Sequence, residues 1–247
     1  MGTNCGYNWH DTGRQVFSDP VTFETFTTNF PIDKKYDFFG ADTVIPASGS
    51  PESGCPWTKK IVGAAPPTVA VVDDGVNGIV ACALTADNQK QDAALHMNDE
   101  LQFSIAQGAI MECRLKLSVL PSGAGAIASF GLWGAWADGG SAYRVGFTAE
   151  GDGEILCESD DNATDTSATS GVTVTTDDWK IYRIDCTDQS NIKFFIDGSR
   201  VAGSTTFENA ASAANSKAQP HVGMYKATGT VVGSIQVDYV RILQNRS

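Results

Sequence analysis

The sequence of 247 residues has few basic residues, few histidines and no long apolar run. Its 17 Lys and Arg residues stand against 29 Asp and Glu, which gives a formal charge of −12. Phosphate contacts and docking on anionic lipid both need a basic surface. The composition therefore argues against a general nucleic-acid binder or a membrane-surface protein. No run approaches the roughly 18 apolar residues that a membrane-spanning helix requires.

Closely spaced cysteine pairs and a leader segment are also missing. The six cysteines lie at least 27 residues apart, so no C-x-x-C pair of a zinc ribbon or a redox site exists. Cys82, Cys113 and Cys186 fall in strand-like patterns and are expected to be small buried residues, and all six cysteines are expected to be free thiols. The first 15 residues contain no basic segment followed by an apolar one. We therefore expect no secretory signal, and synthesis in a reducing cytoplasm.

Several catalytic signatures are absent as well. The sequence contains no G-x-S-x-G elbow, no phosphate-binding P-loop and no G-x-G-x-x-G after a strand. The only histidines, His10, His96 and His221, are too scattered along the chain to nominate a metal site or a catalytic triad.

Strand patterns dominate what is present. In Met111–Val119 apolar residues alternate with polar ones, the period of a strand with one buried face. Asp197-Gly198 has the sequence of a tight hairpin turn. More than ten short strands without a helical rhythm predict an all-β protein, an antiparallel two-sheet jelly-roll β-sandwich. Further strands are expected at 21–30, 68–72, 78–84, 101–106, 126–136, 143–149, 153–158, 172–175, 179–187, 192–196, 219–226 and 234–243.

The chain divides into two regions that form one structural unit. Residues 1–67 are expected to form an N-terminal arm with a first strand and a Pro/Gly-rich loop, and residues 68–247 the sandwich. Phe38–Pro67 is rich in Pro, Gly and Ser and is interpreted as a long ordered loop, pinned to the body by Trp57. The Ala-rich stretch Glu208–Lys217 is the one plausible helical turn, although a loop is equally compatible with it.

Three stretches carry a family resemblance: MECRLKLSVLPSGAGAIASFGLWG (111–134), DWKIYRIDCTDQSNIKFFIDGSRV (178–201) and VDYVRI (237–242). Together they make roughly residues 100–243 resemble the concanavalin A-like lectin/glucanase superfamily. The resemblance is to the family 16 glycoside hydrolases, their non-catalytic relatives and laminin-G-like jelly rolls. It implies the same sandwich fold that the strand alternation predicts.

The catalytic strand of the resembling hydrolases carries two glutamates that flank an aspartate. A retaining mechanism needs the two carboxyl groups about 5–5.5 Å apart. The corresponding stretch here, Ser141–Thr148, contains no acid. The nearest acids, Glu154 and Glu158, share a strand face but come one strand later, so we expect no catalytic residues and no enzyme.

Family 7 alginate lyases share the sandwich and offer a second comparison. Gln219-Pro220-His221 and Tyr225-Lys226 superficially match their motifs, but the Arg-rich strand and the second tyrosine of those lyases are missing. An acidic protein is also a poor partner for a polyanionic substrate. His221 is therefore expected at the surface or edge of the sandwich.

A structural Ca²⁺ is the one cofactor that the resemblance implies. The aspartate of the closing strand helps to hold Ca²⁺ in the resembling hydrolases, and Asp238 matches it, with Glu24 or Asp37 as the candidate N-terminal partner. Calcium takes six to eight oxygen ligands, so one aspartate is weak support. The group Asp160–Asp165 is a second oxygen-rich loop, for which a solvated acidic loop is the favoured alternative.

Aromatic residues suggest a glycan-binding face. Trp133 and Trp136 lie three positions apart and are expected on opposite faces of one strand, with Tyr143 and Arg144 on the next strand. One tryptophan would pack in the core and the other would stack on a sugar. Core packing of all these residues is the alternative, because large aromatics dominate sandwich cores.

Together these features predict a non-enzymatic structural or assembly protein, most concretely a capsid decoration or auxiliary head protein on a phage virion surface. The segment KYDFFGADTVIPASGSPESGCPWTKK is similar in character to unassigned phage structural proteins. Its partners would be other virion proteins or further copies of itself, with no nucleic acid or membrane. A lectin-like carbohydrate-binding module is the first alternative, and a divergent family 16-like glycoside hydrolase the second.

Overall fold

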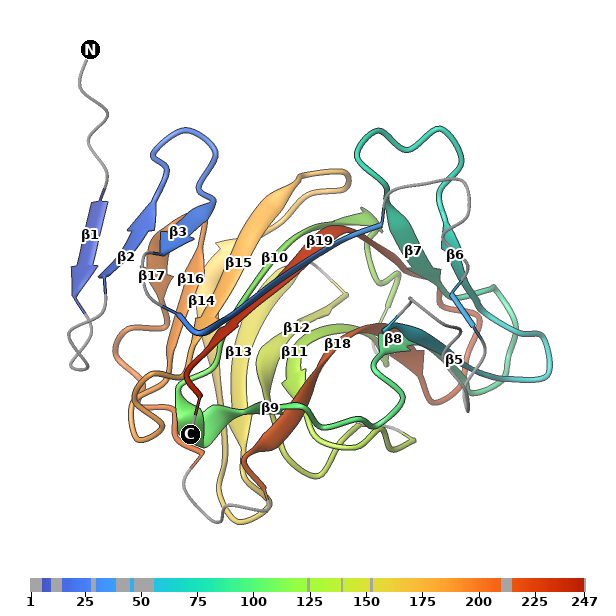
Figure 1. The fold of residues 1–247 in the computed structure, drawn as a ribbon. Coiled ribbons are helices and arrows are strands. Elements are labelled where there is room, and N and C mark those ends of the chain that lie inside the picture. The colour runs from blue at the N-terminus through green and yellow to red at the C-terminus, as the bar shows by residue number, and fades with distance from the viewer. Residues whose placement is uncertain are drawn as a thin grey trace.

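The computed structural model describes residues 6–9, 15–27, 30–38, 45–46, 56–123, 125–138, 140–151, 153–209 and 215–246. Two antiparallel sheets make up the body of the molecule (Figure 1). Within these residues the only helix is the 3₁₀ turn η1 (Ile105–Gln107). The all-β jelly-roll sandwich that the sequence predicts is confirmed.

Sheet 1 has the strand order β14-β13-β12-β11-β18-β8-β5. The short strand β9 pairs with β18 along the same edge as β8, further toward the start of β18. Every pairing in this sheet is antiparallel. Its strands are β5 (Thr58–Val62), β8 (Gln91–His96), β9 (Phe103–Ser104), β11 (Ala126–Trp133), β12 (Arg144–Glu150), β13 (Glu154–Asp160), β14 (Asp165–Thr173) and β18 (Lys217–Lys226).

Sheet 2 has the order β17-β16-β15-β10-β19-β7-β6. β4 pairs with the same edge of β19 as β7 does, but with the C-terminal half of β19. The closing strand β19 is therefore central, as Figure 1 shows in red. Its strands are β4 (Ile32–Asp37), β6 (Thr68–Val71), β7 (Val80–Ala83), β10 (Ile110–Val119), β15 (Lys180–Asp185), β16 (Lys193–Ile196), β17 (Ser199–Val201) and β19 (Ser234–Gln244).

The N-terminal region contributes strands of its own. β1 (Gly6–Trp9), β2 (Gln15–Ser18) and β3 (Thr25–Thr27) form a small three-stranded sheet. β4 joins sheet 2 and β5 joins sheet 1, so residues before 68 extend both sheets of the sandwich. The loop expected at 38–67 is wrong at Thr58–Val62, which forms β5. This segment is a strand because it pairs with the edge of β8 that β18 does not occupy. Parts 39–44 and 47–55 of the expected loop lie outside the described residues.

The core lies between the two sheets and is built by strand alternation. Phe130 and Phe147 from sheet 1 meet Tyr182 and Phe194 from sheet 2, with ring centroids 4.7 to 5.2 Å apart between the sheets. Phe194 in turn contacts Phe207 at 4.8 Å. Aromatic pairs in these geometries stabilise beyond their buried area. Cys82, Cys113, Cys157 and Cys186 are buried free thiols, which confirms the expectation for the cysteines that the structure describes.

The second face of β10 differs from the expected pattern. Glu112 occupies a polar position of the alternation, yet only 1% of it is exposed. It accepts a hydrogen bond from the hydroxyl of buried Tyr239 at 3.0 Å. Alternation places Glu112 away from the core, but it cannot show that this face of sheet 2 is covered.

Besides β5, two more strands of sheet 1 depart from the sequence expectation. The segment expected at 172–175 is only the end of β14, which begins at Asp165, and β8 was not expected. The expected helical turn at 208–217 has residues 210–214 outside the described part, and Lys217 begins β18. In the described part of the chain, no helix has the length and apolar character needed to cross a membrane.

Candidate functional site: a pocket on the solvent face of sheet 1

A pocket lies on the face of sheet 1 that points away from the core. Its volume of about 160 Å³ is roughly ten times what one water molecule needs on the same measure. Core residues alternate with pocket residues along the central strands, so the strand period itself places the lining. The lining side chains come from β8, β11, β12, β13, β18 and the segment after β11: Asp92, Ile127, Ser129, Trp133, Trp136, Ala137, Gly140, Arg144, Thr148, Glu150, Glu158, His221, Met224 and Tyr225.

Two glycines on neighbouring strands leave room for the Trp133 indole at the base of the pocket. Gly131 on β11 lies directly opposite Gly146 on β12. A Cβ at Gly146 would lie 2.6 Å from the Phe130 carbonyl oxygen and 3.1 Å from Nε1 of Trp133. The indole of Trp133 therefore lies over Gly146, in space that only a glycine leaves free.

His221 forms the other side of the pocket base. It lies on β18, opposite Gly131, and its ring stacks on the indole of Trp133 with centroids 4.1 Å apart and planes 16° apart. Its Nε2 lies 3.2 Å from Oγ of Ser129. Burial, and then the nearby His96, lower the pKa of His221 to about 3, so the ring is neutral at physiological pH. His221 was expected at the surface or edge of the sandwich; the edge is wrong because β18 is an interior strand, and on the outward face of sheet 1 the side chain is buried.

Trp136 lies beyond the end of β11 and closes one end of the pocket. Its backbone N–H donates to Asp99 at 2.6 Å, and the ammonium of Lys60 lies 4.5 Å from the centre of its indole. An ion pair between Lys90 and Asp138 ties down the same segment. Trp133 and Trp136 therefore line one pocket, and the expectation of opposite faces is wrong because the strand ends at Trp133.

Gln219 holds the segments that follow β8 and β11 in place through its side-chain amide. Its side-chain oxygen accepts from the backbone N–H groups of Met97 and Asp99 at 2.9 and 3.1 Å. Its amide donates to the Asp99 carboxylate at 2.7 Å and to the carbonyl of Gly134 at 3.1 Å. One glutamine thus joins β18 to the ends of β8 and β11, which is a structural role.

Asp92 is a carboxylate in the pocket wall. It lies on β8, opposite Tyr225 of β18, and only 5% of it is exposed. Desolvation raises its pKa to about 7, and Asp138 adds to the rise. The Trp136 side chain and the two lysines, Lys60 and Lys90, oppose the rise without cancelling it.

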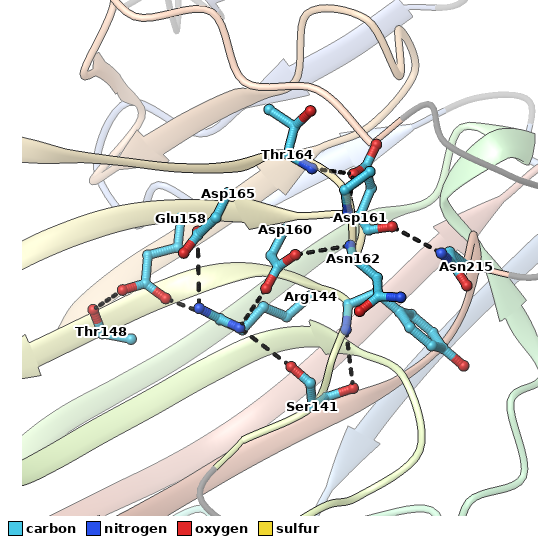
Figure 2. A network of polar contacts seen from close by, with 12 residues as sticks. Ser141, Arg144, Thr148, Glu158, Asp160, Asp161, Asn162, Thr164, Asp165 and Asn215 are labelled. Carbon is cyan, nitrogen blue, oxygen red and sulfur yellow. Dashed lines mark hydrogen bonds and ion pairs between the residues drawn. The ribbon is translucent and has the colours of Figure 1, made fainter.

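Arg144 organises the acidic side of the pocket (Figure 2). Its Nε donates to Glu158 at 3.1 Å, and Nη1 donates to Asp160 at 2.9 Å and to the carbonyl of Ser141 at 3.2 Å. Thr148 donates to the other oxygen of Glu158 at 3.1 Å. The guanidinium charge is therefore already compensated by carboxylates of the same chain.

Two further glutamates lie side by side on the same face of sheet 1, and one of them, Glu150, lines the pocket. Glu150 at the end of β12 is directly opposite Glu154 at the start of β13, on the face that also carries Glu158. Glu150 is exposed, whereas Glu154 is partly buried and accepts a hydrogen bond from Thr169. Like charges in this position are mutually unfavourable.

Tyr143 was expected beside Arg144 as a ligand-binding residue, and it does not line the pocket. A Cβ at Gly134 would lie 2.2 Å from the ring of Tyr143, so this ring packs against the glycine after β11. Of the four expected glycan-binding residues, the pocket brings together Trp133, Trp136 and Arg144.

Of the three residues expected to hold calcium, Asp238 and Asp37 lie on sheet 2, and Glu24 directly precedes β3. Asp238 on β19 forms an ion pair with Arg114, with Nη1 and Oδ2 2.5 Å apart. It also lines a surface hollow to which Glu24 contributes. Asp37 at the end of β4 pairs with Lys35 at 3.5 Å. Among the described residues, no three His, Cys, Asp or Glu side chains come together in a group that could hold a metal ion. The calcium site stays a prediction.

The second oxygen-rich loop is shaped by its own backbone. Asp160 accepts from the N–H of Asn162 at 2.8 Å. Asp161 accepts from the N–H groups of Ala163 and Thr164 at 3.0 and 2.8 Å (Figure 2). These contacts are those of polar turns, and Asp160 also binds Arg144. The loop therefore supports the acidic side of the pocket.

Sequence reasoning missed Asp92, Ser129 and Thr148 as pocket residues. Thr148 alternates with core residues in a strand that was expected, so its face was predictable although its neighbours were not. Asp92 had no such signal, because the stretch QDAALH has no clear period of two.

Comparison with known proteins identifies the fold alone. No family model matches the chain, and no curated protein matches it significantly. A protein of unknown function from Shewanella oneidensis MR-1 aligns with a TM-score of 0.58 at 15% identity, over 87% of this chain and 88% of that one. A lichenase (β-1,3-1,4-glucanase) derived from a mouse hindgut metagenome aligns with a TM-score of 0.56 at 13% identity, over 87% and 99% of the two chains.

The similarity extends to proteins with other activities. A family 16 glycoside hydrolase from Bacteroides ovatus, solved with a mixed-linkage glucan product, has a TM-score of 0.56 at 15% identity, over 85% of this chain and 99% of that one. The binding domain of a botulinum neurotoxin has a TM-score of 0.53 at 8% identity, over 80% of this chain and 45% of the other chain. The same sandwich thus serves hydrolases and binding domains, so the function must be argued from the pocket.

Proposed function

We propose that the protein is a carbohydrate-binding module whose pocket on sheet 1 holds part of a glycan without cleaving it. The observation that carries this proposal is the convergence of Trp133 and Trp136 with Asp92 at one pocket. Sugar sites combine aromatic surfaces with a few polar groups that fix orientation. Similarity of fold to glucan-binding enzymes is compatible with the proposal and does not establish it.

The positions of the acids support binding without hydrolysis. Pocket-facing positions of β12 hold Arg144, Gly146, Thr148 and Glu150, so a carboxylate occurs only at its end. By strand geometry, Glu150 and Glu158 are about 14 Å apart at Cα. Known mechanisms place the two carboxyl groups about 5–5.5 Å apart for retention and about 6.5–9.5 Å apart for inversion. Glu158 is also committed to Arg144 and Thr148.

Binding is tested by screening the protein on an array of oligosaccharides and measuring each hit by calorimetry. We expect Trp136→Ala to weaken binding at least tenfold. The matched control is Trp179→Ala, which removes a tryptophan stacked on Arg114 at sheet 2. Equal losses in the two variants, or no binding by the unmodified protein, would contradict the proposal.

A second candidate is a glycoside hydrolase. It is favoured by Glu150 and Glu154, which face each other across β12 and β13 and are close enough in register to act as a pair. Incubation with neutral polysaccharides, followed by chromatography of the products, decides between the candidates. Cleavage that disappears in both Glu150→Gln and Glu154→Gln, but persists in Glu100→Gln, would establish the hydrolase.

The structural role on a virion surface stays a prediction, as do self-association and location on a particle. It is compatible with glycan binding, since a sandwich that displays a sugar pocket suits an exposed surface. Purified particles should contain the protein at a fixed copy number. Its recovery only as free protein would argue against this role.

A further inference from the structure

The pocket presents two buried indole N–H groups without hydrogen-bond partners of good geometry, and a third buried polar group beside them. The indole N–H groups of Trp133 and Trp136 are buried donors that make no hydrogen bond with described residues. Trp133 is 8% exposed, so its N–H is largely removed from water. Buried polar groups are nearly always satisfied, and a pair of unsatisfied donors in a pocket wall indicates that a ligand supplies the acceptors.

The third group is the Asp92 carboxylate, which is only 5% exposed. The Trp136 indole N–H is close enough to lower its pKa, yet it forms no hydrogen bond of good geometry. The pocket wall therefore offers one strong acceptor close to a donor.

We propose that Asp92 and the two indole N–H groups anchor a hydroxyl-rich, uncharged sugar unit, and that the pocket rejects acidic sugars. This inference rests on the proposed carbohydrate-binding function. A sugar hydroxyl both donates and accepts, so it can give its proton to Asp92 and receive an indole N–H. A uronate carboxylate has no proton to give at neutral pH and would lie against like charge.

The surrounding charges favour the same ligand class. Arg144 is the only cation in the lining of this pocket, and Glu158 and Asp160 already bind it. The other lining charges are Asp92, Glu150 and Glu158. Close to Asp92, Lys90 is paired with Asp138 and Lys60 lies over Trp136. An anionic sugar would therefore find no free cation in the pocket.

A pH profile follows from the groups around Asp92. They are Lys60 of β5, Lys90 before β8, Asp138 after β11 and Tyr225 of β18. Asp92 has a pKa near 7, so it becomes ionised as the pH rises from 5.5 to 8.5. An ionised acceptor makes a stronger hydrogen bond than a neutral one. Affinity for a neutral sugar should rise about tenfold over this range.

The experiment measures binding of neutral hexasaccharides of glucose, mannose, xylose and galactose, and of hexamers of guluronate and galacturonate, at pH 5.5, 7.0 and 8.5. We expect at least one neutral sugar to bind, with both uronates at least tenfold weaker. Asp92→Asn should lower the affinity at pH 8.5 at least tenfold and flatten the pH profile. The matched control, Asp73→Asn, replaces an exposed aspartate outside the pocket.

Thermal melts and Asp92→Ala, as a second variant, exclude a folding defect as the cause. If a neutral sugar binds Asp92→Asn and the unmodified protein equally, or a uronate binds more tightly than every neutral sugar, the inference is wrong while carbohydrate binding stands. If none of the six sugars binds at any pH, the inference is overturned. If the wider array also fails, the proposed function falls with it.

Discussion

The imidazole of His221 stacks on the indole of Trp133 with ring centroids 4.1 Å apart. The two residues come from neighbouring strands, β18 and β11, and meet across the glycine Gly131. Both rings line the pocket, so a side chain that can be protonated forms part of its aromatic surface. Burial makes the protonated form of His221 costly, which gives the first prediction.

We predict that His221 makes the protein sensitive to acid. A folded pKa of about 3 against 6.5 means that the unfolded chain binds more protons between these values. The part of the free energy of unfolding that depends on neutral His221 is therefore fully present above about pH 6.5 and is lost as the pH falls toward 3. His221→Gln should be less stable than the unmodified protein at pH 7.5, and this deficit should shrink by roughly 2–3 kcal/mol at pH 4.5. Urea denaturation at the two pH values measures it, and a constant deficit would refute the prediction.

For Asp92 we predict the opposite pH dependence of stability. Its folded pKa of about 7 lies above the usual 3.8, so the folded state retains a proton that the unfolded chain has lost. Stability from this group is complete below about pH 3.8 and is lost as the pH rises through 7. The Asp92→Asn variant should gain stability relative to the unmodified protein, and the gain should grow by roughly 2–3 kcal/mol from pH 5 to pH 8.

Denaturant titrations at these two pH values test the prediction, with the exposed Asp73→Asn as the control. A variant that is more stable and yet binds glycan less well would show that the pocket sacrifices stability for function. A gain that is the same at both pH values would show that Asp92 is not the group that titrates.

Lys226 should be a strong determinant of stability. Its side chain is fully buried, and the ammonium donates to the carbonyls of Thr85, Asp87 and Val231 at 2.6, 2.7 and 3.0 Å. Lys226→Met would leave three carbonyls without a donor, at a cost of about 2–4 kcal/mol. Lys217→Met, at the exposed start of the same strand, should change stability by less than about 0.5 kcal/mol. Equal effects of the two substitutions in chemical denaturation would contradict this role.

Gly146→Ala should displace Trp133 from the base of the pocket. The added methyl group would lie 2.6 Å from a backbone oxygen and 3.1 Å from the indole nitrogen, so strand or ring must move. We expect a destabilisation of about 1–3 kcal/mol, a change in tryptophan fluorescence and loss of glycan binding. In Gly151→Ala the methyl group has its nearest neighbour at 4.0 Å, which makes it the control. Unchanged fluorescence and binding in Gly146→Ala would show that the base of the pocket does not depend on this glycine.

The sequence determined the strand content and the positions that face the core, because a period of two is a local property of the chain. The period in Met111–Val119 predicted β10 with its buried face, and the stretches at 126–136, 143–149 and 219–226 located the strands that line the pocket. The sequence also shows directly that residues 141–148 contain no acid, because this observation concerns a single strand and does not depend on its neighbours.

Tertiary structure decided which side chains meet. Trp133 and His221 are 88 positions apart in the sequence, and only the pairing of β11 with β18 brings them into contact. Trp136 joins them because the strand ends before it, which the local pattern did not reveal. The polar strand β14 and the short strand β8 form because neighbours supply their hydrogen bonds. The burial and raised pKa of Asp92 likewise follow from the sheet around it, since its own stretch of sequence has no period that places it.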